Sequence, residues 1–283
     1  MGGAIALALP IDKYTIDYLV VRDRAKAKRR SDLVVFREKV VELQEIDRIG
    51  SDLVFITTGD TEIHAAAAQL RDKFDSRPTV FHFSGALQIG VLEILAPVVK
   101  TFGSIHPLVS ISDPRDGPGN FRGAYFCVDG PDEAIAVANE IVVDLGGSPF
   151  EIEPSRRALY HAAAVMASGD LVALFDAATE MMALAGVDRG LCRRLLIPLI
   201  ESTLQNLKRQ PPERALTGPF ARADIDTLEK HLDTIEEFGT PELLAIYLTL
   251  GERSLDLAQR GNTDLTRIER LRRRISLAKS HAR

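Results

Sequence analysis

The order of apolar segments constrains the fold of this 283-residue chain most strongly. Up to residue 152, short apolar runs typical of strands alternate with longer helical patterns, whereas every segment after Glu153 has a helical pattern. The strand candidates are residues 17–21, 52–57, 79–84, 103–108, 124–129 and 149–152. Strands and helices that alternate at this spacing predict βαβ units and a mainly parallel sheet covered by helices.

The helical segments complete a two-domain plan. In the first part they cover residues 2–9, 62–74, 87–100 and 131–145. In the second part they cover residues 155–185, 188–209, 222–236 and 240–260, with a last helix from about residue 263. Glycine and proline separate these helices. We therefore expect an α/β domain in residues 1–152 and an all-helical domain in residues 153–283.

The bulk properties exclude several classes of partner. The net charge of −5 gives no reason to expect nucleic acid or an anionic membrane surface. No apolar run reaches the roughly 18 to 20 residues of a membrane helix, so no membrane span is expected. Cys127 and Cys192 have neither metal nor redox spacing, which fits a reducing cytoplasm. No cluster of histidine, cysteine and carboxylate residues has the spacing of metal ligands, so no metal is predicted.

An alanine-rich stretch, residues 157–168, opens the helical part and is a candidate site. Its alanines would let a ligand or another backbone approach closely. His161 and Ser168 are seven residues apart, which places them on one face of a helix. The pair would either bind a ligand or tie helices together as a buried polar pair. A hydrolase is disfavoured, because the Gly-x-Ser-x-Gly motif is absent.

A second group of candidates follows the strands of the first domain. In open α/β sheets, ligands bind outside the carboxyl ends of the strands. Thr58-Gly59 and Ser84-Gly85 stand at two such ends, and their glycines would let a cofactor approach the backbone, although turn formation alone also explains them. His106, at the end of another strand, is either a hydrogen-bond donor or general acid, or a structural histidine bonded to backbone.

The sequence resembles a known family in five short pieces that occur in order. They are residues 80–86, 103–108, 157–165, 215–219 and 222–224. The family consists of bacterial proteins with a Rossmann-like domain followed by a helical domain of unknown function. It is similar to pyrroline-5-carboxylate reductases, ketopantoate reductases and β-hydroxyacid dehydrogenases. The resemblance extends from the first residues to about Ala258, and it implies a dinucleotide cofactor and a homodimer formed largely by the helical domain.

Two positions depart from the family pattern. The family's first strand and glycine-rich turn would precede Gly2, so that only Gly2 or Gly3 stands where the last glycine of the turn is expected. The resemblance therefore implies a Rossmann-like sheet whose first strand is missing or truncated, with an impaired phosphate site unless the true start lies upstream. After Ser168 the family has an asparagine, whereas this chain has Gly169, which removes an amide that would bind a ligand.

The resemblance also bears on whether the cofactor is NAD or NADP. Arg22 follows the strand after which related dehydrogenases bind the adenosine ribose, and an arginine there suits the 2′-phosphate of NADP. The alternative is a solvated basic loop. Thr217, in the piece 215–219, is either a substrate contact or part of a turn between helices.

These observations lead to one leading function and two alternatives. The leading function is an NADP-dependent oxidoreductase acting on a small carbonyl or imine in the cleft between the domains. His106, His161, Ser168 and Thr217 would contact the substrate. The cofactor-binding residues would be Gly2, Gly3, Arg22, Thr58, Gly59, Ser84 and Gly85. The alternatives are a non-enzymatic, dimeric dinucleotide- or metabolite-binding protein and a partner-binding module that uses the basic C-terminal helix.

Overall fold

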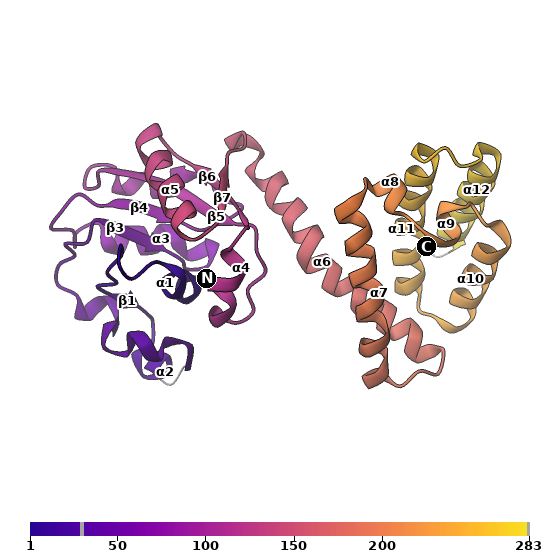
Figure 1. Cartoon of the computed structure of the whole chain (residues 1–283), viewed down its shortest axis with the longest axis horizontal. Coiled ribbons are helices and arrows are strands. Elements are labelled where there is room, and N and C mark those ends of the chain that lie inside the picture. The colour runs from indigo at the N-terminus through magenta and orange to yellow at the C-terminus, as the bar shows by residue number, and fades with distance from the viewer. Residues whose placement is uncertain (29–30, 282–283) are drawn as a thin grey trace. The chain divides into compact units, whose positions relative to one another are not determined.

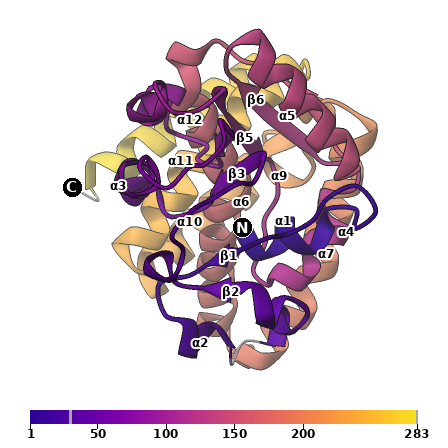
Figure 2. The same ribbon diagram turned by 90° about the vertical axis from the view of Figure 1, so that its left-hand side faces the viewer.

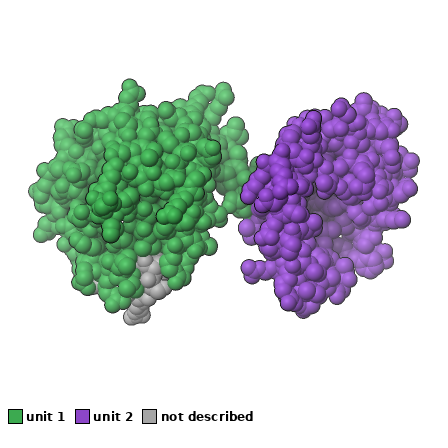
Figure 3. Space-filling view, viewed as in Figure 1, with its two compact units in different colours: residues 1–169 green, residues 170–283 purple. Residues whose placement is uncertain are grey.

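The computed structural model describes residues 1–28 and 31–281, and these residues form two compact units. The first unit comprises residues 1–169 and the second comprises residues 170–283 (Figure 3). Each unit has its own hydrophobic core. The division falls inside helix α6 (Arg157–Leu184), so the predicted domain boundary at residue 153 marks where secondary structure changes and otherwise stays a prediction.

A five-stranded sheet forms the centre of the first unit (Figure 1). Its strands, in spatial order, are β3 (Leu53–Ile56), β4 (Thr79–His82), β5 (Thr101–Pro107), β6 (Tyr125–Asp129) and β7 (Ser148–Phe150). Neighbouring strands are parallel except for the antiparallel pair β5–β6. The predicted mainly parallel sheet and five of its strands are therefore confirmed.

Alternate residues of the strands enter two different cores, as expected for a sheet that is covered on both faces. Phe81 joins a core to which α1 (Gly2–Ala8), α4 (Gly117–Phe121) and α5 (Asp132–Asp144) contribute. Its neighbour Val80 joins the opposite core. That second core includes residues of α3 (Ile63–Leu70) and of the 3₁₀ helix Ile89–Leu95.

One helix expected in this unit has a different form. Residues 87–100 were expected to be α-helical, but the structure has the 3₁₀ helix Ile89–Leu95 followed by turns. Pro97 explains part of the difference, because proline lacks the backbone N–H that an α-helix continuing through this position needs.

The strand nearest the N-terminus pairs outside the large sheet. β1 (Leu19–Val20) is parallel to β2 (Val40–Val41) in a separate two-stranded sheet, as Figure 2 shows. β3 is the edge strand of the five-stranded sheet. Within the described residues no strand pairs with the outer edge of β3. The short helices α2 (Arg24–Lys28) and Ser31–Lys39 (3₁₀) connect β1 to β2.

The second part of the chain is helical, as predicted. After α6 come α7 (Arg189–Arg209), α8 (Pro212–Ala215), α9 (Gly218–Ala221), α10 (Ile225–Phe238), α11 (Pro241–Arg260) and α12 (Leu265–His281). The predicted long helices agree with α6, α7, α10, α11 and α12 to within a few residues. Only the two single-turn helices α8 and α9 were not expected.

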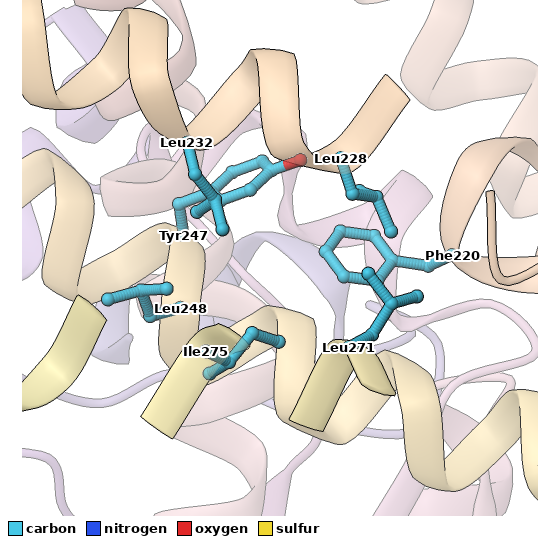
Figure 4. A pocket seen from close by; sticks show the side chains of 7 residues that line it. All are labelled: Phe220, Leu228, Leu232, Tyr247, Leu248, Leu271 and Ile275. Atoms are coloured by element: carbon cyan, nitrogen blue, oxygen red, sulfur yellow. The ribbon is translucent and has the colours of Figure 1, made fainter. Parts of the chain in front are cut away.

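The helical unit has a tight core and a basic last helix. A small cavity in this core, about 10 Å³ and lined by Phe220, Tyr247 and aliphatic side chains, has room for no more than about one water-sized sphere (Figure 4). In α12, Arg274 and Lys279 form ion pairs with acidic residues of α10 and α11. The basic tail is therefore bound, at least in part, by its own unit.

Helix α6 contains an apolar stretch that bears on the expectation of no membrane span, which stays a prediction. Among the described residues, residues 154–184 form a helix that contains an 18-residue window with a mean hydropathy of 1.4, so that by length and composition alone it is apolar enough to cross a membrane. Ser168 and Asp170 interrupt the apolar run, but the many alanines around them keep the average high. Large apolar side chains of this helix are exposed, among them Leu159 (71%), Met166 (69%) and Val172 (69%).

Candidate functional site

Two neighbouring strands bring the first candidate residues together. β4 and β5 are parallel, with His82 opposite Ser104 in the register, so their carboxyl ends lie side by side. Ser84 and Gly85 follow β4, and His106 lies two residues beyond Ser104 in β5. The structure thus places these predicted residues at one edge of the sheet, where parallel α/β sheets bind ligands.

The first turns of α6 add two aromatic rings to this edge. Tyr160 Oη lies 2.7 Å from His106 Nδ1, and the rings of His106 and His161 are 5.8 Å apart in an edge-to-face arrangement. Tyr160 also packs edge-on against Phe150 of β7, with ring centroids 6.0 Å apart. All of these residues belong to the first compact unit. His106 and His161, predicted separately from a strand end and a helix, are therefore neighbours.

Gly85 lies directly against both histidines. A Cβ atom at this position would overlap the His161 ring and would lie 2.6 Å from His106 Nε2. Contacts that short require the neighbours to move, so only glycine fits between the two rings. We call this group, Gly85, His106, Tyr160 and His161, the histidine site.

A buried arginine joins α6 to the sheet behind the histidine site. The Arg157 side chain is only 1% exposed. One terminal nitrogen donates a hydrogen bond of 2.8 Å to the Ser84 carbonyl, and the other lies 3.6 Å from a carboxylate oxygen of Asp129. Arginine is rarely buried to this extent without a charged partner. The guanidinium therefore ties the start of α6 to the end of β4 and to β6.

Several buried polar groups around Arg157 have incomplete hydrogen bonding. His82, Ser104 and Asp129 occupy matching register positions on β4, β5 and β6. His82 Nε2, Ser104 Oγ, one Asp129 oxygen and two Arg157 nitrogens have no hydrogen-bond partner among the described residues. Two of these atoms, the Asp129 oxygen and one Arg157 nitrogen, face each other at 3.6 Å as the ion pair described above. The strands β4, β5 and β6 thus carry a row of polar side chains next to Arg157.

Burial and the nearby cation keep two histidines neutral. The pKa of His106 falls to about 4, chiefly because burial disfavours the charged imidazolium, and further because of Arg157 and His161; Asp60 opposes the shift. The pKa of His82 also falls to about 4, through burial first and Arg157 second. At neutral pH the His106 ring is therefore an uncharged donor and acceptor of hydrogen bonds.

Residues predicted to bind the cofactor gather at a neighbouring part of the first unit. Arg22, just after β1, forms an exposed ion pair with Glu62, which lies just beyond the Thr58-Gly59 turn. Thr58 and Gly59 are exposed there. Any 2′-phosphate that Arg22 bound would compete with Glu62 for the guanidinium.

The start of the first helix lies against the end of β3. A Cβ atom on Gly2 would overlap the Thr57 hydroxyl, so this glycine allows helix α1 to begin in contact with the strand end. Gly3, beside it, is half-buried. The two N-terminal glycines thus lie near the Thr58-Gly59 turn that follows β3.

Two predicted substrate residues lie away from these contacts. Ser168 is exposed and forms no hydrogen bond within the described residues. Its position, seven residues after His161 on α6, corresponds to a rise of about 10 Å along the helix. Thr217 belongs to the other compact unit, where it is exposed and precedes α9. Their role in a site stays a prediction.

Sequence reasoning missed the role of Arg157 and Tyr160, although both lie in the stretch that it singled out. One weak signal existed: a cation in the first turn of a helix opposes the helix dipole, which suggests another partner. Tyr160 gave no signal beyond its place next to His161. For metals, the described residues contain no group of three or more His, Cys, Asp or Glu side chains arranged to hold an ion.

The comparisons with known proteins agree with this fold. Residues 124–254 match the family model "Domain of unknown function (DUF2520)". No match was found among curated proteins. Among solved structures, protein TM1727 from Thermotoga maritima superimposes with a TM-score of 0.70 at 22% identity, over 92% of this chain and 98% of that one.

Two further solved structures have the same fold. Protein BF3122 from Bacteroides fragilis has a TM-score of 0.70 at 18% identity, over 90% of this chain and 93% of its own. Pyrroline carboxylate reductase from Plasmodium falciparum, with NADP bound, has a TM-score of 0.53 at 13% identity, over 91% of this chain and 92% of its own. Residues 124–254 therefore resemble the DUF2520 family, and over nearly its whole length the chain has the Rossmann-like and helical fold that the sequence resemblance predicted.

Proposed function

We propose that this protein is an NADP-dependent oxidoreductase that acts on a small carbonyl or imine compound. The observation that carries the proposal is the meeting of Gly85, His106 and His161 at the carboxyl ends of adjacent parallel strands. A glycine that leaves room beside two imidazole rings provides both close backbone approach and hydrogen-bond donors. The Plasmodium reductase, which has this fold, has NADP bound.

The residues present fit a dinucleotide along the strand ends. Gly85 leaves a space that a Cβ would fill, and Gly2 brings the start of α1 against the end of β3. Gly3, Thr58, Gly59 and Ser84 are the remaining predicted cofactor contacts, and Arg22 would provide the cation for the 2′-phosphate. When bound, NADPH supplies a hydride.

The protein's own residues would act on the substrate oxygen or nitrogen. Neutral His106 has one ring nitrogen, Nε2, without a hydrogen-bond partner among the described residues, and this atom faces Gly85. It would donate a hydrogen bond to the carbonyl oxygen or imine nitrogen and so polarise the bond. His161 would bind the remainder of the substrate, whereas the predicted roles of Ser168 and Thr217 stay predictions.

The cofactor proposal predicts measurable NADPH binding that depends on Gly85. We expect purified protein to change the fluorescence of NADPH and to saturate below about 1 mM, the usual upper limit for such substrates. Gly85→Ala places a methyl group against His106 and His161, and we expect it to weaken binding at least ~10-fold, which corresponds to about 1.4 kcal/mol.

Gly90→Ala is the matched control, because Gly90 is exposed and has nothing within 4 Å of its added Cβ. It should bind NADPH like the wild type. Thermal unfolding of both variants shows whether they fold. The absence of binding by the folded wild type, or equal binding by Gly85→Ala, would contradict the proposal. Binding without turnover on carbonyl and imine compounds would favour the non-enzymatic alternative.

We also propose a homodimer that covers the exposed apolar side chains of α6. Leu159 and Met166 are one heptad apart, as are Val165 and Val172, and all four are exposed. Apolar repeats at this spacing are typical of helices that pack against another helix. Large apolar side chains that are exposed side by side on one helix mark an interaction site.

The dimer proposal predicts a mass in solution of twice the 31.1 kDa of one chain. Met166→Glu with Val172→Glu places charges on the exposed side of α6 and should shift the protein to the monomer in sedimentation or light-scattering measurements. Leu265→Glu changes another exposed leucine, at the start of α12, and should leave the dimer intact. A wild-type monomer would refute the proposal. We place this dimer in the cytoplasm, in keeping with two buried, unpaired cysteines.

A further inference from the structure

We propose that Tyr160 is a positioning residue that fixes the tautomer of His106, so that Nε2 carries the ring proton and faces the space beside Gly85. The catalytic consequence of this inference rests on the proposed function, whereas the assignment of the His106 tautomer depends only on the protein's own residues. It starts from the hydrogen bond of 2.7 Å between Tyr160 Oη and His106 Nδ1.

The direction of this hydrogen bond follows from what each group can do. A neutral imidazole has one N–H donor and one acceptor nitrogen, whereas a phenol can donate or accept. Tyr160 is half-buried, and its hydroxyl has no hydrogen-bond partner among the described residues other than His106. If Nδ1 donated, the phenolic proton would have no acceptor, and burying an unpaired donor is costly.

The charges nearby favour the same arrangement. Burial raises the pKa of Tyr160 well above its usual value, so the hydroxyl keeps its proton. The low pKa of His106 leaves its ring neutral. With a protonated phenol and a neutral imidazole, Tyr160 donates to Nδ1, and the ring proton of His106 must then be on Nε2.

The position of Nε2 explains why the tautomer of His106 matters for substrate binding. A Cβ added to Gly85 would lie 2.6 Å from this nitrogen, so Nε2 faces the space that glycine leaves open. With the proton on Nε2, the ring donates a hydrogen bond to a substrate oxygen or nitrogen. With the proton on Nδ1, it would present a lone pair, which repels those same atoms. The site thus suits substrates that accept a hydrogen bond at the reacting centre.

The packing of the tyrosine ring holds its hydroxyl in place. Tyr160 contacts Phe150 and His106 edge-on, with ring centroids 6.0 Å and 5.5 Å away. Phenylalanine keeps these ring contacts and removes only the hydroxyl. Tyr125 provides a matched control, because it packs on the same Phe150 and forms no hydrogen bond to a histidine among the described residues.

The test is ¹⁵N NMR of protein labelled on histidine, in which protonated and unprotonated ring nitrogens give separate signals. His106→Gln identifies the signals of His106 among the six histidines. We expect the wild type and Tyr125→Phe to show His106 protonated on Nε2. In Tyr160→Phe, we expect the Nδ1 and Nε2 signals of His106 to move towards each other, because both tautomers become populated. A proton on Nδ1 in the wild type, or an unchanged spectrum in Tyr160→Phe, overturns the inference.

Kinetics separate this inference from the proposed function. Where the wild type turns over an NADPH-dependent substrate, Tyr160→Phe should lower kcat by about 10- to 100-fold, less than the loss of a proton-transferring group itself, with KM changed less than about threefold. An unchanged kcat overturns the catalytic consequence. Failure of the wild type to bind NADPH overturns the proposed function and leaves the NMR result as the measure of the tautomer.

Discussion

Replacing Arg157 by methionine is expected to destabilise the first unit by about 3–5 kcal/mol, because one partner of a buried ion pair is removed. The substitution leaves the Asp129 carboxylate, which is only 12% exposed, without its cation. It also removes the hydrogen bond from the guanidinium to the Ser84 carbonyl. Methionine fills much of the same volume, so the loss reports the polar contacts rather than a cavity.

The adjacent residue gives a matched control. Arg156 has a side chain that is 73% exposed and pairs with Glu153, which is also exposed. Exposed ion pairs of this kind contribute roughly 0–1 kcal/mol. Arg156→Met should therefore have almost no effect, although it removes the same chemical group one position earlier.

Urea unfolding followed by circular dichroism measures the loss, and hydrogen exchange of peptides from β4 and β6 assigns it to the first unit. Arg157→Lys should recover part of the stability, since lysine keeps the charge but has no planar fork to reach two acceptors. If Arg157→Met unfolds within about 1 kcal/mol of Arg156→Met, the guanidinium does not tie α6 to the sheet.

Lowering the pH from 7 to 5 is expected to reduce the stability of the first unit by about 1–2 kcal/mol for each of His82 and His106. Both have a pKa of about 4 in the folded protein, below the value of 6.5 that applies when the chain is unfolded. Between these values the unfolded chain binds protons that the folded protein does not. The stabilisation is therefore present above about pH 6.5 and is lost as the pH falls towards 4.

The slope of stability against pH is the quantity to measure. His106→Gln should lower stability at pH 7 through its lost contacts, but it should also remove about half of the histidine-dependent decrease between pH 7 and pH 5. His64→Gln is the control, because His64 is exposed on α3 and its removal should leave the slope unchanged. A slope that is the same in His106→Gln and the wild type would show that His106 is not held neutral by the fold.

Much of the fold could be predicted from the sequence because its elements carry local signals. The helices α10 and α11 repeat apolar residues with a helical period and are separated by Gly239. The strands β3 to β5 are short apolar runs that end at turn residues. The antiparallel direction of β6 was not predictable, since a strand's residues do not encode the direction of its neighbour. The 3₁₀ form of residues 89–95 was also missed, as a helical pattern alone does not distinguish the two helix types.

The candidate site, like the fold, could be predicted from the sequence only in part. By itself, the sequence determined the kinds of residue available: a histidine at a strand end, glycines after strands, and a histidine in an alanine-rich helix. Only the tertiary structure decided that His106, His161 and Gly85 touch, that Tyr160 bonds to His106, and that Arg157 is buried. The physical reason is that the packing of α6 on the ends of β4 and β5 selects which side of the helix faces inward. That packing depends on contacts between residues more than 50 positions apart, about which local sequence patterns carry no information.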